Sequence, residues 1–176
     1  MTPGHTARPA RTPLYTAEER RRRDATPWTL VQGILAPVQF LVFAVSLCLV
    51  LRFLSTGEGL TAAEISVVVK TLTLYTIMVT GAIWEKEVFG HYLFARPFFW
   101  EDMVSMLVIA LHTAYIAALF TGSLSSDQRM YLALAAYATY VINATQFVLK
   151  LRSARLDMAA RERAVEAGPG SLGLAE

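Results

Sequence analysis

The segment Phe98–Phe120, FFWEDMVSMLVIALHTAYIAALF, decides the fold of this chain. It is long and apolar enough to cross a bilayer, because about 20 apolar residues span roughly 30 Å of hydrocarbon. The segment also contains two adjacent carboxyl groups and a histidine, and ionisable groups inside such a span are costly enough to mark a functional site. We expect a helix here that presents one narrow stripe to protein and not to lipid, formed by Glu101, Ser105, Val108, His112 and Tyr115.

The composition supports a membrane protein throughout. Hydrophobic residues make up 55% of the 176 residues and charged residues only 17%, which is unlike an ordinary soluble domain. The net charge of +2 is too small to indicate a nucleic-acid partner. We therefore predict an all-α membrane protein with four transmembrane helices in an antiparallel bundle.

The chain divides by composition into four parts. Residues 1–14 are rich in proline and basic residues and predict a disordered tail. Residues 15–28 predict a basic helix lying on lipid headgroups, and Thr16 followed by Glu19 has the spacing of a capping box. Residues 151–176 predict a charged helix that ends in a frayed tail. The transmembrane domain is predicted over 29–150, with spans at about 30–54, 65–84, 98–120 and 130–149.

The distribution of basic residues predicts the orientation. Six Lys and Arg precede Trp28, two lie between the second and third spans, and five follow Leu149. By the positive-inside rule both termini are cytoplasmic. The cytoplasmic level then holds a layer of polar and aromatic side chains: Gln32, Trp84, Glu85, Glu101, Asp102, Asn143 and Gln146.

The carboxyl groups in that layer suit acid catalysis. Burial disfavours the charged form of a carboxyl group, and a protonated carboxyl is what a general acid needs. The alternative is that Glu85, Glu101 and Asp102 lie at helix boundaries and are merely solvated, with the first turn of a helix favouring negative charge.

Two ionisable residues lie deeper. Lys70 is about six residues inside the second span, close enough to the edge for its stem to carry the ammonium back to water, which is the favoured interpretation. His112 is either a hydrogen-bonded core residue or an axial ligand to a porphyrin-type metal.

Three long strings carry a family resemblance. They are RRRRDATPWTLVQGILAPVQFLVF, VVVKTLTLYTIMVTGAIWEKEVFGHYLFARPFFWEDMVSMLVIALHTAYIAALFTG and LALAAYATYVINATQFVLKLRSARL. Together they resemble the 3-vinyl bacteriochlorophyllide hydratase family of bacteriochlorophyll biosynthesis, from about Leu14 to Leu156 and across all four spans.

The resemblance implies a hydro-lyase that adds water to the 3-vinyl group of a chlorophyllide or bacteriochlorophyllide, leaving a 1-hydroxyethyl group. It implies no cofactor: water is the co-substrate, and the magnesium belongs to the substrate. The location implied is the bacterial inner, intracytoplasmic membrane, with membrane lipid, other enzymes of the pathway and a second copy of the chain as candidate partners. The competing function is a non-catalytic tetrapyrrole carrier, and a third interpretation is a small proton-coupled transporter.

The site assignments rest on the residues and not on the resemblance. Glu101 is predicted to donate the proton, while Asp102 or Glu85 holds the attacking water. We expect Asn143 and Gln146 to orient the substrate. Trp84 and Gln32 are expected to line the substrate site in the same cytoplasmic layer. Arg96, Lys86 or the basic run Arg20–Arg23, at the same level, would meet the substrate carboxylate. The substrate magnesium would be bound by His91, or else by His112, which lies roughly 16 Å of helix rise from Glu101.

Overall fold

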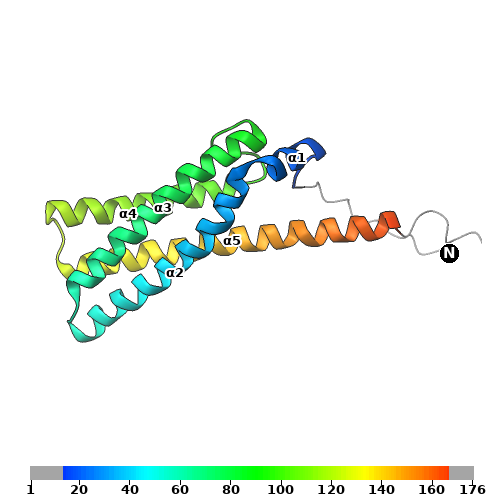
Figure 1. Cartoon of the computed structure of the whole chain (residues 1–176). Helices are drawn as coiled ribbons and strands as arrows, with labels where there is room; N and C mark the ends of the chain where they lie inside the picture. Colours follow the sequence, from blue (N-terminus) through cyan, green and yellow to red (C-terminus); the bar gives the residue numbers. More distant parts are fainter. Residues whose placement is uncertain (1–13, 167–176) are drawn as a thin grey trace, which may run out of the picture.

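The computed structural model describes residues 14–166, and in this part of the chain it contains five helices (Figure 1). Four of the helices are long and apolar enough to cross a membrane, so the chain is an integral membrane protein. The helices are α1 (Ala17–Ala25), α2 (Pro27–Thr56), α3 (Leu60–Phe89), α4 (Phe99–Thr121) and α5 (Ser126–Glu166).

α2, α3 and α5 extend beyond the predicted spans at both ends, and α4 matches its span within one residue. Local capping and turns, more than the edge of the apolar run, set the ends of α2. Thr26 caps α2 and Pro27 occupies its first turn, where a missing N–H costs nothing. At the other end Gly57 and Gly59 adopt φ of +74° and +83°, which reverses the chain into α3. The basic helix is shorter than predicted, and its capping box at Thr16 is confirmed. The predicted tails lie almost entirely outside the described residues, at 1–13 and 167–176.

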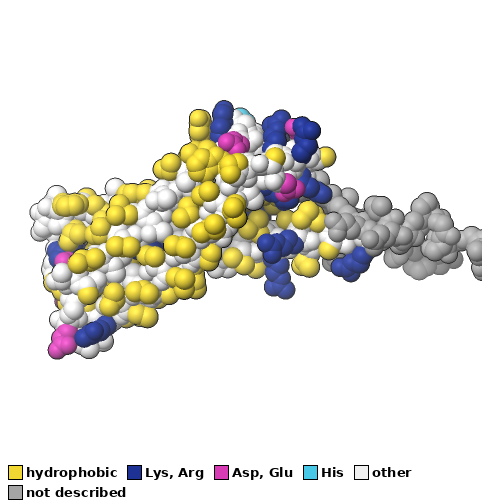
Figure 2. All heavy atoms as spheres, viewed as in Figure 1, with side chains coloured by type: hydrophobic (Ala, Val, Ile, Leu, Met, Phe, Trp, Pro, Cys, Tyr) yellow, Lys and Arg dark blue, Asp and Glu magenta, His cyan; other side chains and the backbone are white. Residues whose placement is uncertain are grey.

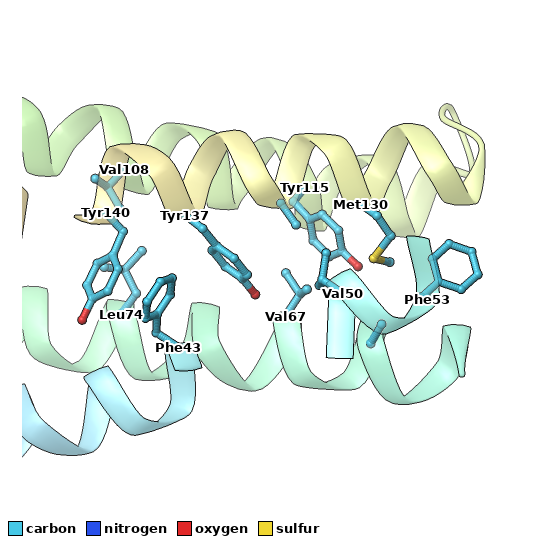
Figure 3. Packing of buried hydrophobic residues seen from close by; sticks show 12 residues of the cluster. Phe43, Val50, Phe53, Val67, Leu74, Val108, Tyr115, Met130, Tyr137 and Tyr140 are labelled. Carbon is cyan, nitrogen blue, oxygen red and sulfur yellow. The ribbon is translucent and has the colours of Figure 1, made fainter. Parts of the chain in front are cut away.

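The helices pack mainly in two pairs, α2 with α3 and α4 with α5. Buried side chains recur every three to four residues on α2 and α4 and over the first half of α3 and α5, as helix packing requires. Figure 3 shows aromatic rings of Tyr137 and Tyr140 on α5 facing Phe43 on α2. The stripe predicted on α4 is confirmed, because every one of its five residues is buried in the bundle.

The two ends of the bundle differ. We call the end with α1 and the connection 90–98 the loop end, and the end with the two short reversals after α2 and α4 the turn end. Figure 2 shows hydrophobic side chains over the visible face of the bundle, while most of the visible Lys and Arg gather around the loop end. A hydrophobic flank between two charged ends is the arrangement of a protein surrounded by lipid.

Candidate active site

Three carboxyl groups meet at the loop end. Glu85 lies one turn before the end of α3, and Glu101 and Asp102 lie in the first turn of α4. All three are buried, at 6%, 8% and 3% exposure. The alternative that these groups are merely solvated is therefore wrong. We call the three residues the carboxyl cluster.

Glu85 and Asp102 form a pair within this cluster. Their side chains lie close enough to interact with each other, and two carboxyl groups that share a hydrogen bond need one proton between them. The connection 90–98 holds both. The Phe94 N–H donates to Asp102 Oδ2 at 2.7 Å, and the Ala95 N–H donates to Glu85 Oε2 at 3.3 Å. The connection thus fixes two buried carboxyl groups next to each other, and this arrangement favours one shared proton over two negative charges.

Phe94 has a backbone conformation that is rare for a residue with a side chain. Its φ is +60°, in the left-handed region, which costs roughly 1–2 kcal/mol for an L-residue other than glycine. Consecutive N–H groups around a left-handed residue can point into one concavity and bind negative oxygens. The strained residue therefore lies where the backbone N–H groups of the connection bind Asp102 and Glu85.

Glu101 has a different partner. Its Oε2 lies 2.6 Å from Lys150 Nζ on α5, an ion pair with side chains 10% and 25% exposed. Lys150 also lies over the ring of Phe98, 5.0 Å from the centroid. A carboxylate held by an ammonium at this distance is ionised. Glu101 is therefore the charged member of the cluster.

Asn143 locks α5 to α4 beside that ion pair. Its Nδ2 donates to the Glu101 carbonyl oxygen at 2.8 Å. Ser105 Oγ lies 2.9 Å from the same carbonyl oxygen and 3.3 Å from Asn143 Oδ1. The amide that was expected to orient the substrate thus holds the two helices in register.

Aromatic rings cover the cluster on one side. Phe98 stacks on Phe147 and makes edge or tilted contacts with Trp84 and Phe89, at centroid distances of 5.8–5.9 Å. Tyr15, just before α1, stacks on Phe89 at 5.7 Å. Phe98 links these rings to the carboxyl cluster through Lys150, whose ammonium lies over its ring.

A second group of rings is exposed beside the Glu85–Asp102 pair. Phe94 contacts Phe99, and Phe99 contacts Trp100, at centroid distances of 5.8 and 5.5 Å. The three residues are 41%, 42% and 72% exposed. We call them the aromatic shelf.

The remaining predicted site residues are spread more widely. Gln32 Nε2 donates to Thr80 Oγ1 at 2.7 Å, and Trp84 Nε1 donates to Thr29 Oγ1 at 2.9 Å, so both polar groups join α2 to α3. His91 and Arg96 are exposed in the connection 90–98. Gln146 is half-buried, and its Oε1 has no partner.

The two deeper residues lie away from the carboxyl cluster. The interpretation that Lys70 reaches back to water is wrong, because the side chain is 0% exposed and packs over the Tyr140 ring. His112 is also 0% exposed, and its Nδ1 donates to the Val108 carbonyl oxygen at 2.8 Å.

Two features of the site were missed by sequence reasoning. Lys150 is one: it follows Asn143 by seven residues and therefore shares a helix face with it, a signal that was available in the sequence. The other is the pair of N–H donors at Phe94 and Ala95. Nothing in the sequence predicts that a phenylalanine adopts the left-handed conformation that places these donors. Among residues 14–166, no group of three or more His, Cys, Asp or Glu is arranged to hold a metal ion.

Fold and site together define a helical integral membrane protein with three buried carboxyl groups at one end of its bundle. The family model for 2-vinyl bacteriochlorophyllide hydratase (BCHF) matches residues 15–153. The chain belongs to this family.

Two relatives support this membership. A 2-vinyl bacteriochlorophyllide hydratase of Rhodobacter capsulatus is 68% identical over 160 residues, which cover 91% of this chain and 93% of the relative. A protein of the same name from Cereibacter sphaeroides is 68% identical over 162 residues, covering 92% and 100%. Their names number the vinyl group 2, where the resemblance drawn from the sequence used 3. No solved structure matches the chain.

Proposed function

We propose that this chain adds water to the vinyl group of a bacteriochlorophyllide, with the carboxyl cluster at the loop end as its active site. Family membership over residues 15–153 supports the reaction. The observation that carries the location is the burial of Glu85 and Asp102 next to each other, held by the N–H groups of Phe94 and Ala95, which favours one proton shared between them. Acid-catalysed addition of water to an alkene needs such a proton.

The proposed reaction begins with proton transfer from the pair to the terminal vinyl carbon. The resulting cation is next to the macrocycle, whose π-system delocalises it. Water then forms a C–O bond to the cationic carbon that is attached to the ring and gives a proton back to a carboxylate, so the acid is regenerated and the product is a 1-hydroxyethyl group. Water is the co-substrate, magnesium is part of the substrate, and no redox cofactor takes part.

The roles within the cluster follow from the partners of each group. A general acid must carry a proton, and two adjacent buried carboxyl groups favour keeping one between them, whereas Glu101 is ion-paired to Lys150. We therefore assign proton donation to the pair and the binding of the attacking water to the Glu101 carboxylate. The sequence-based assignment of Glu101 as proton donor stays a prediction. Its ion pair with Lys150 favours an ionised Glu101 and therefore a role in binding the attacking water.

The exposed rings of the aromatic shelf form a surface on which the flat macrocycle could bind. The shelf is exposed on the flank of the bundle, and the Phe94 N–H joins it directly to Asp102. A ring lying on Phe94, Phe99 and Trp100 would bring an edge substituent to the proton-sharing pair. Exposed Arg96 would meet the substrate carboxylate, and exposed His91 would reach its magnesium, with His112 as the second candidate ligand.

The topology proposed for this arrangement is an antiparallel bundle with both termini cytoplasmic, which follows from the Lys and Arg distribution. The loop end then lies at the cytoplasmic interface of the bacterial inner membrane, where the substrate carboxylate and water both have access. A second copy of the chain and other enzymes of the pathway are the candidate protein partners.

Isotope incorporation tests the function. Membranes containing the protein are incubated with a vinyl-bearing chlorophyllide in ¹⁸O-water, and the pigment is analysed by mass spectrometry. We expect one ¹⁸O atom in a hydroxyethyl product, with many equivalents converted per protein. Stoichiometric release of unchanged pigment would instead identify a carrier, and unlabelled product would exclude hydration.

A further inference from the structure

Three helices of the bundle each contribute a buried polar atom without a protein partner. They are Lys70 Nζ on α3, His112 Nε2 on α4 and Gln39 Oε1 on α2, in side chains 0%, 0% and 3% exposed. We call these three residues the deep cluster. An unsatisfied polar group in an apolar interior costs several kcal/mol, so a cluster drawn from three helices needs a partner.

The ammonium end of Lys70 is placed by an aromatic ring. Nζ lies 3.8 Å from the centroid of the Tyr140 ring. The ring face attracts the amino group, but a π-face cannot accept all of its N–H bonds. Tyr140 in turn contacts Phe43, at 4.9 Å between centroids, and Gln39 lies one turn before Phe43 on α2.

His112 is linked to Lys70 through the rings of Tyr137, Phe43 and Tyr140. A carbonyl oxygen can only accept, so the 2.8 Å contact with Val108 makes Nδ1 the N–H donor. In the neutral ring Nε2 then carries a lone pair and acts as an acceptor. The imidazole is tilted against Tyr137 at 5.9 Å, and Tyr137 contacts Phe43 at 5.4 Å (Figure 3).

The chemistry of these atoms selects their ligand. Lys70 offers N–H donors, which disfavour the binding of a metal cation. His112 Nε2 and Gln39 Oε1 offer lone pairs, which disfavour the binding of an anion. A small neutral molecule that accepts one hydrogen bond and donates two satisfies all three, and water is such a molecule.

We propose that the deep cluster is a binding site for an internal water molecule that accepts from Lys70 and donates to His112 and Gln39. The site is separate from the carboxyl cluster, since His112 and Glu101 are 11 residues apart on α4, or roughly 16 Å of helix rise. The proposal does not depend on the proposed function.

Solid-state NMR of the full chain in lipid bilayers tests the site. With ¹⁵N-labelled His and Lys, magnetisation is transferred from water to the protein, and each side-chain signal is followed over the mixing time. Exposed His91 serves as the wetted reference and the fully buried methyl groups of Val50 as the dry one. We expect His112 and Lys70 to receive magnetisation as His91 does.

A matched variant separates bound water from general leakage into the bundle. His112→Phe removes one acceptor, so transfer to Lys70 should fall toward the level of Val50 while transfer to His91 stays the same. Transfer to Lys70 and His112 no greater than to Val50 in the unaltered chain would overturn the proposal. Equal transfer to Lys70 with and without His112 would overturn it too.

Discussion

The carboxyl cluster at the loop end and the deep cluster in the middle of the bundle are both buried and polar, but only the first has its charges paired. Glu101 has Lys150, while Glu85 and Asp102 have each other and two backbone N–H groups. In the deep cluster, Lys70 and His112 each keep a polar atom without a protein partner. Pairing holds a proton and a charge in fixed places, which is what acid catalysis requires.

Access separates the two regions as well. The carboxyl cluster adjoins the aromatic shelf, whose rings are 41–72% exposed, whereas both ionisable side chains of the deep cluster are 0% exposed. A macrocycle can therefore approach the first region from the lipid without separating helices. We expect substitutions at the two regions to affect turnover, stability and binding differently.

The largest effect is expected from Asp102→Asn. An amide cannot supply the shared proton, so turnover should fall about 10²–10⁴-fold, the usual contribution of a general acid, while pigment binding is retained. Turnover of the variant is measured at saturating pigment in bilayers. Asp127→Asn, at the exposed turn end, is the control and should be fully active. Full activity in the Asp102→Asn variant would contradict the assignment of proton donation to the Glu85–Asp102 pair.

Lys150→Met should mainly reduce stability. It leaves the Glu101 carboxylate buried without its cation, which costs about 2–3 kcal/mol in the free energy of unfolding. Denaturant titration in mixed micelles measures the loss, and exposed Lys86→Met serves as the control. Adding Glu101→Gln to the Lys150 variant should restore part of the stability. No recovery in the double variant would show that the ion pair is not the cause.

Substitution of the two histidines compares the regions by pigment affinity. His91→Ala should weaken binding about tenfold, or 1.4 kcal/mol, because His91 is the exposed candidate for the substrate magnesium. His112→Ala should change affinity less, since its ring is closed inside the bundle. The absorption shift of bound chlorophyllide reports each affinity. A larger loss in the His112 variant would move the pigment site into the deep cluster.

The smallest effect concerns the loop that grips the carboxyl pair. Phe94→Gly and Phe94→Val both remove the ring, but only glycine adopts φ of +60° without cost. The valine variant should therefore be less stable than the glycine variant by about 1–2 kcal/mol. The comparison uses the same unfolding titration. Equal stabilities would mean that the left-handed conformation is not retained.

The fold was largely predictable from the sequence, and the pairing within the site was not. Periodicity alone placed Glu101 and His112 on the buried face of α4, because a helix fixes which residues share a face. It could not show that Lys150 meets Glu101, since that contact depends on how α4 and α5 are rotated against each other. Lys70 was misjudged for a related reason: the length of a side chain shows how far it can reach, but not that Tyr140 holds it inside.

The central claim is that Glu85 and Asp102 share a proton while Glu101 is ionised. Infrared difference spectroscopy of the protein in bilayers at neutral pH tests it directly, through the C=O stretching band of a protonated carboxylic acid. The account predicts that this band is present, that it is lost in both Asp102→Asn and Glu85→Gln, and that Glu101→Gln leaves it unchanged. A band that disappears only in Glu101→Gln would contradict the account and return the role of proton donor to Glu101.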